Sequence, residues 1–153
     1  MRKANIPVYQ TAQQSSPVLS DEVRQIVTFV APIIKKRITR IYQDSAMAEE
    51  GCAAPHCVTG WLSMLALSGI RPIAMTGDQS FHALLVQDKR VGWLCLFDCR
   101  ATPERQCQQF CHEFCEFLLA ACPKLGKTGQ ECYPLSCSSI RDIIANLVAA
   151  ELC

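Results

Sequence analysis

The sequence lacks the features that mark several common functional classes. Even its most apolar stretches, such as Trp61–Ile70, fall well short of the roughly 20 residues that a membrane helix needs. It has no Gly-rich phosphate-binding loop, which leaves nucleotide binding without support. Basic residues form no dominant stripe, so nucleic-acid binding is not expected either. The C-x2-C pairs typical of zinc modules are also missing.

The first ten residues, MRKANIPVYQ, contain two basic side chains but no apolar core of signal-peptide length. We therefore expect a soluble, cytoplasmic protein without a membrane span. A protein translocated by a specialised secretion system would look the same. The expected partners are proteins, either a substrate or a binding partner.

What the sequence does contain is enough apolar material for one domain. Of its 153 residues, 50% are hydrophobic and 19% are charged, with a formal net charge of +1. A chain of this size and composition folds around a sizeable core. Residues 1–19, with two prolines and a Gln/Ser run, predict a loose N-terminal arm, and residues 20–153 predict a single domain.

Cysteine is unusually abundant, with eleven residues. The count is odd and no export signal accompanies it, so free thiols in a reducing compartment are favoured over a disulfide framework. Cys107, Cys111 and Cys115 recur every four residues within an apolar helical stripe, which indicates core packing rather than zinc ligation. No metal and no cofactor are expected.

The hydrophobic periodicity predicts helices separated by a short block of strands. Pro32 lies inside the first helix and should kink it or split it in two. Thr102 is the expected N-cap of the third helix, with Pro103 at its first position. The expected helices are 20–42, 56–69, 102–122 and one that begins at Ser138 or Ser139; the expected strands are 71–75, 81–87 and 93–98. This order predicts an α+β fold, in which a small antiparallel sheet of about three strands packs with four or five helices.

The last two strands form a hairpin that carries one histidine and one aspartate. If its loop is centred on Arg90, Leu84 faces Leu96 and His82 faces Asp98. Directly opposed residues have Cβ atoms roughly 4.5–5.5 Å apart, within reach of an imidazole–carboxylate hydrogen bond. Gly92 is able to shift this register by one residue, which would place Asp98 diagonal to His82.

Cys57 lies near the start of the second helix, where the positive end of the helix dipole favours a thiolate. A thiolate beside an imidazole that a carboxylate orients is the general arrangement of an activated nucleophile. The first amides of the same helix are candidate oxyanion donors. Cys52, in the preceding loop, is an alternative nucleophile.

Three segments in order, Cys57 with GWLSMLALSGIRP, then FHALLV, then GWLCLFD, resemble the papain-like superfamily, and within it the transglutaminase-like group that includes bacterial glutamine deamidases. The resemblance implies Cys57 as nucleophile, His82 as base and Asp98 as the residue that orients the base. It also implies an enzyme that acts on an amide or thioester, as a protease, deamidase or acyltransferase.

A structural interpretation of the same residues stays open. His82 would be a strand histidine bonded to a carbonyl, Asp98 a cap of the turn into the next helix, and Cys57 one more buried thiol. The chain would then be a non-catalytic adaptor, chaperone or subunit of a larger assembly, because its amphipathic helices offer apolar surface for a partner.

Overall fold

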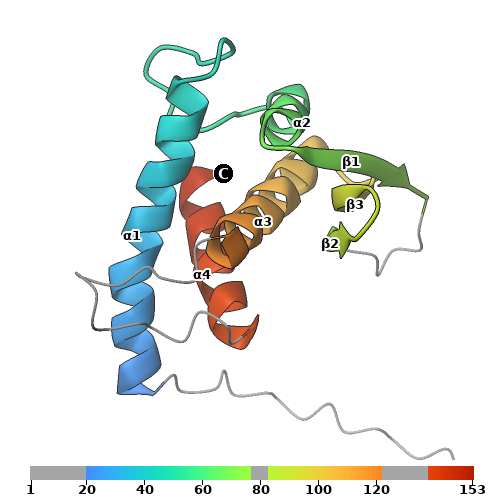
Figure 1. Ribbon diagram of the computed structural model, residues 1–153. Helices are drawn as coiled ribbons and strands as arrows, with labels where there is room; N and C mark the ends of the chain where they lie inside the picture. The colour runs from blue at the N-terminus through green and yellow to red at the C-terminus, as the bar shows by residue number, and fades with distance from the viewer. Residues whose placement is uncertain (1–19, 77–82, 122–137) are drawn as a thin grey trace, which may run out of the picture.

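The computed structural model describes residues 20–76, 83–121 and 138–153, and in these ranges it contains four helices and a three-stranded sheet. Figure 1 shows α3 between the sheet on one side and the neighbouring helices α1 and α4 on the other. The predicted α+β class is confirmed. No helix in the described ranges is long and apolar enough to span a bilayer. The elements in chain order are α1 (Asp21–Gln43), α2 (Val58–Leu67), β1 (Ile70–Met75), β2 (Leu84–Asp88), β3 (Gly92–Asp98), α3 (Pro103–Ala121) and α4 (Ser138–Leu152).

The sheet is mixed, whereas the sequence predicted an antiparallel one. Its strand order is β1-β3-β2, with β1 parallel to β3 and β2 antiparallel to β3. The hairpin register is as predicted, since Leu84 pairs with Leu96 and Val86 with Leu94, and Gly92 occupies a turn conformation with φ of 84° without shifting it. The antiparallel prediction failed for β1 because β1 adds to the β3 edge of the hairpin, a choice that tertiary packing makes.

The helix ends follow local sequence rules. The Ser20 side chain accepts a hydrogen bond from Val23 N–H, and Thr102 Oγ1 accepts one from Arg105 N–H at 3.3 Å. Gly69, with φ of 79°, directly follows the cap of α2. Of the two outcomes predicted at Pro32, a kink or a split, the split does not occur. α1 runs unbroken from Asp21 to Gln43, and its buried face continues on both sides of the proline.

The core is centred on α3. Phe110, Cys111, Phe114 and Cys115 have no exposed surface, so the predicted core role of the helical cysteines is confirmed. Edge-to-face ring contacts join α3 to its neighbours: Phe114 meets Trp61 of α2, and Phe110 meets Phe97 of β3. All eight cysteines in the described ranges are free thiols.

One carboxylate lies inside this packing. Glu113 on α3 is 9% exposed, and its Oε2 accepts a hydrogen bond from Leu85 N–H of β2 at 2.9 Å. Burial raises the pKa of Glu113 from 4.5 to about 7, against the lowering effect of that hydrogen bond. Burial therefore favours the protonated form of Glu113, although the hydrogen bond from Leu85 N–H is itself stronger when the group is a carboxylate.

Glu113 predicts a pH-dependent stability. Between about pH 4.5 and about 7 the unfolded chain has released the proton that the folded chain keeps, so the free energy of unfolding should fall by up to about 3 kcal/mol as the pH rises. Glu113→Gln keeps an acceptor for Leu85 N–H and cannot titrate, so it should remove most of this slope. Urea unfolding at several pH values in metal-free buffer measures this dependence of the free energy of unfolding on pH. Glu104→Gln, which removes an exposed carboxylate, is the control. Parallel curves for wild type and Glu113→Gln would contradict the assignment.

Candidate functional site

Cys57 is the N-cap of α2, as its sequence position predicted. Its backbone is extended, with φ of −134° and ψ of 159°, and the helix begins at the next residue. The side chain is exposed, and its Sγ lies 3.3 Å from Thr59 Oγ1. Cys57 is therefore a solvent-accessible thiol at a helix N-terminus, not another core cysteine.

The surroundings of this thiol favour its thiolate form. The Thr59 hydroxyl makes the largest contribution to a lowered pKa of Cys57, followed by the backbone N–H of Gly60. The slight burial of the thiol and the negative charge of Glu49 act in the opposite direction. No hydrogen bond of standard geometry joins the Cys57 side chain to the helix backbone. The N–H groups of the first turn therefore act as nearby dipoles, which attract the negative charge of a thiolate sulfur.

Gly60 allows the sulfur to lie against the first turn of α2. A Cβ atom at this position would come within 2.9 Å of Pro55 Cβ and 3.4 Å of Cys57 Sγ. Pro55 is buried beneath the helix start. Its Cβ is part of the rigid proline ring and cannot easily move aside. A side chain at residue 60 would therefore push the loop and the thiol away from the helix N–H groups.

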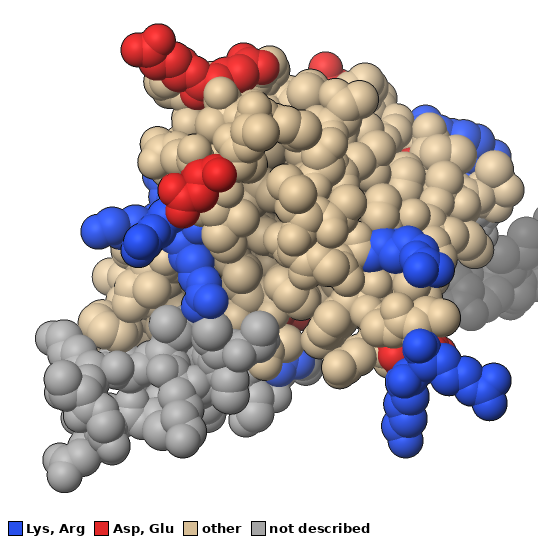
Figure 2. Space-filling view, turned by 45° about the horizontal axis from the view of Figure 1, so that its top comes forward, with Lys and Arg blue, Asp and Glu red and all other residues tan. Residues whose placement is uncertain are grey.

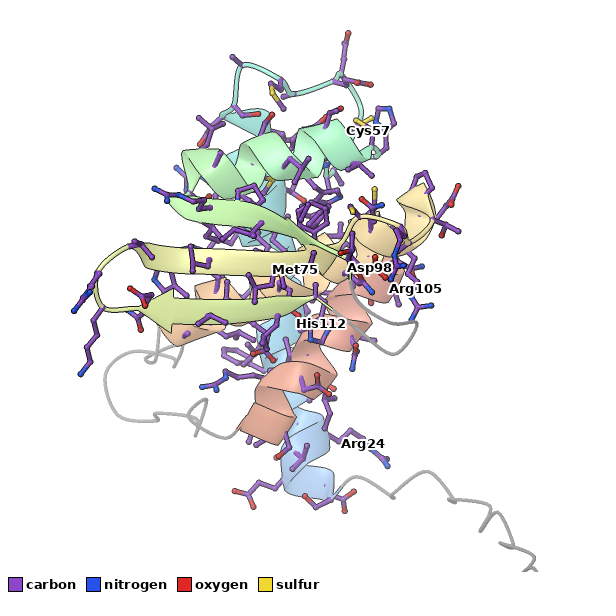
Figure 3. All side chains as sticks on the ribbon, turned by 90° about the vertical axis from the view of Figure 1, so that its right-hand side faces the viewer. Arg24, Cys57, Met75, Asp98, Arg105 and His112 are labelled. Atoms are coloured by element: carbon purple, nitrogen blue, oxygen red, sulfur yellow. The ribbon has the colours of Figure 1, made fainter. Side chains whose placement is uncertain are left out.

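The topology brings the ends of several helices and strands to the same end of the molecule as Cys57. Because α2 leads directly into β1 and runs back along it, the start of α2 and the carboxyl end of β1 lie at the same end of the molecule (Figure 3). β3 is parallel to β1 and pairs Asp98 with Met75, so its carboxyl end lies there too. Burial does most to raise the pKa of Cys107 on α3, and the charge of a Cys57 thiolate adds a smaller contribution, which indicates that the first turns of α3 lie near Cys57.

Asp98 ends β3 with its side chain largely buried. Its Oδ1 accepts a hydrogen bond from Arg100 N–H at 2.9 Å and lies 3.6 Å from Arg100 Nε. These contacts match the structural interpretation of Asp98 as a cap of the turn into α3. His82 lies outside the described residues, so its predicted pairing with Asp98 and its action on Cys57 stay predictions.

Cys52, the alternative nucleophile, lies half-buried in the loop before α2. Its Sγ lies within 4.8 Å of a ring nitrogen of His56. Unlike Cys57, it is not the cap of a helix.

Two groups of side chains within the described ranges have the composition of a metal site. Glu49, Cys52 and His56 form one in the exposed loop before α2. His112, Glu116 and Asp142 form the other, between α3 and α4. The second group was not predicted from the sequence. The four-residue spacing of His112 and Glu116 on a helix was the available signal, but the third member comes from a different helix.

The Thr59 hydroxyl predicts a measurable change in the reactivity of Cys57. Thr59→Val keeps the shape of the side chain and removes its hydroxyl, so the pKa of Cys57 should rise and its alkylation at about pH 6.5 should slow by about three- to tenfold. Thr59→Ser retains a hydroxyl and should react like wild type. Equal rates for Val and Ser variants would mean that the helix N–H groups alone tune the thiol.

None of the protein-family models, curated proteins or solved structures compared with this chain matches it. The resemblance to transglutaminase-like enzymes therefore rests on the three sequence segments alone and stays a prediction. The chemistry of the site itself is therefore the basis for a proposed function.

Proposed function

We propose that this protein is a thiol-dependent enzyme that acts on an amide or thioester through Cys57, with His82 as base and Asp98 as the residue that orients it. The observation that carries the proposal is the environment of Cys57: an exposed thiol at the N-cap of α2, 3.3 Å from a hydroxyl, with its pKa lowered. Exposure and a lowered pKa are the two properties that distinguish a reactive cysteine from a structural one.

The chemistry follows from these groups. The Cys57 thiolate attacks the substrate carbonyl carbon, and the N–H groups that begin α2, which lack intrahelical partners, stabilise the developing oxyanion. The leaving group departs with a proton from the imidazolium of His82, and a thioester at Cys57 remains. Attack by water, activated by the same imidazole, gives hydrolysis or deamidation. Attack by an amine gives acyl transfer.

The surface around α2 supports a protein as substrate. α2 contains no charged residue, and it lies at the top of Figure 1, which Figure 2 turns toward the viewer. Figure 2 shows a broad uncharged area in the middle of this face, with acidic and basic side chains gathered at its margins. Leu67 at the end of α2 is 70% exposed. An uncharged face of this kind favours contact with a polypeptide.

Mass-spectrometric mapping of iodoacetamide labelling at about pH 6 tests the proposal, because thiols with an ordinary pKa near 8.5 are then almost fully protonated. Cys57 should react at least tenfold faster than Cys99, a second exposed thiol in the same chain. His82→Ala should abolish this advantage. His56→Ala, which removes the imidazole next to Cys57 in the sequence, should leave it unchanged.

The other outcomes are equally informative. Selective labelling of Cys52 would move the nucleophile to the loop and keep the mechanism. Loss of labelling in His56→Ala rather than His82→Ala would replace the base. Uniformly slow labelling of all cysteines would reject the enzyme and favour the adaptor, for which co-purification with a protein partner is the next measurement.

A further inference from the structure

A second cluster of functional side chains lies between α3 and α4, apart from Cys57. His112 and Glu116 are four residues apart on α3 and share one face of that helix, and Asp142 lies on α4, which packs along α3. One atom from each of the three side chains lies within 4.8 Å of the other two. His112 Nε2 is 3.3 Å from Asp142 Oδ1 and 4.0 Å from Glu116 Oε1.

Asn146 on α4 orients the imidazole. Its Nδ2 donates to Asp142 Oδ2 at 3.3 Å, because a carboxylate can only accept. Its Oδ1 therefore faces His112 Nδ1 at 3.0 Å and accepts the Nδ1–H. In the neutral imidazole the lone pair then belongs to Nε2, the nitrogen that faces the two carboxylates. Metal-bound histidines are typically held in this way, through the ring N–H that does not contact the metal.

The spacing of the three atoms suits a small divalent ion. A tetrahedral site with ligand bonds of about 2.0–2.2 Å separates its ligand atoms by about 3.4 Å. The distance of 3.3 Å between His112 Nε2 and Asp142 Oδ1 already fits this value. Glu116 Oε1 lies 4.0 Å from the same nitrogen, so this partly exposed side chain would have to approach the imidazole by about half an ångström. One imidazole nitrogen with two carboxylate oxygens favours zinc-like ions over calcium or magnesium, which prefer oxygen ligands alone.

A cavity next to these side chains supports a ligand site independently of their spacing. His112, Glu116 and Asp142 all line the same cavity of about 810 Å³. Gln109 lines it as well, and both atoms of its amide group are buried without a hydrogen-bond partner in the described part of the chain. Unpaired buried amides are costly and point to a ligand or ordered water. Arg105 also lines the cavity, and its positive charge suits an anion beside the metal.

We propose that His112, Glu116 and Asp142 bind a divalent transition-metal ion of the zinc class, and that its fourth coordination position opens into the cavity, where water or a small anion binds. Asn146 is the positioning residue for the imidazole. The ion joins α3 to α4, and the site is independent of the thiol chemistry proposed for Cys57, which does not line this cavity.

Cobalt(II) titration of the reduced full-length protein tests the proposal, because the absorption spectrum separates nitrogen–oxygen ligands from thiolates, an essential distinction in a chain with eleven cysteines. We expect one Co²⁺ per chain without a thiolate-to-cobalt charge-transfer band, displaced by Zn²⁺. His112→Gln and Asp142→Asn should each weaken this binding at least tenfold, and Asn146→Ala should weaken it by about tenfold.

The group of Glu49, Cys52 and His56 in the loop before α2 supplies the matched control. His56 Nδ1 lies 3.6 Å from Glu49 Oε2, but both side chains are about 60% exposed, and the same group includes a thiol. His56→Gln should leave the nitrogen–oxygen cobalt signal unchanged. Circular dichroism of the metal-free variants checks that they fold. The proposal is overturned if wild type shows only a thiolate-type spectrum, if no Co²⁺ binds, or if folded His112→Gln binds as wild type does; His112 and Asp142 would then form an ion pair only.

Discussion

The burial of α3 on opposite faces is the constraint on which the rest of the structure depends. One face packs against α1 and α4, and the other meets α2 and the sheet (Figure 1). The residues at these contacts must be apolar. Cysteine meets this demand, since Cys111 and Cys115 are completely buried without forming disulfides. Packing thus explains the buried cysteines of α3, whereas Cys57 and Cys99 are exposed.

The same packing separates Cys57 from the buried thiols. Burial raises the pKa of Cys95 to about 12 and also raises that of Cys107, so neither forms a thiolate readily. Cys57 instead lies outside the core at the start of α2, where a hydroxyl and the helix N–H groups lower its pKa. Residue type alone does not distinguish these thiols. Their positions relative to α3 do, because the dielectric environment decides whether sulfur can hold a charge.

Two parts of the fold then carry different chemistry. The mixed sheet directs the carboxyl ends of β1 and β3 toward the end of the molecule where α2 begins, the end at which Cys57 and Asp98 lie. The α3–α4 contact brings carboxylates and an imidazole to a cavity that neither Cys57 nor Asp98 lines. Asp98 is held by Arg100 in its turn, so any action on an imidazole would use a carboxylate that already has a structural partner.

Local features of the sequence determined much of this protein. The caps at Ser20 and Thr102, the glycine after α2, the hairpin register and the position of Cys57 at a helix start all depend on residues close together in the chain, and hydrogen bonding or alternation over a few residues is enough to specify them. Tertiary structure decided the rest. The parallel pairing of β1, the continuity of α1 through Pro32 and the meeting of Asp142 with His112 depend on which surfaces bury each other, and contacts between residues distant in the chain leave no periodic signal in the sequence.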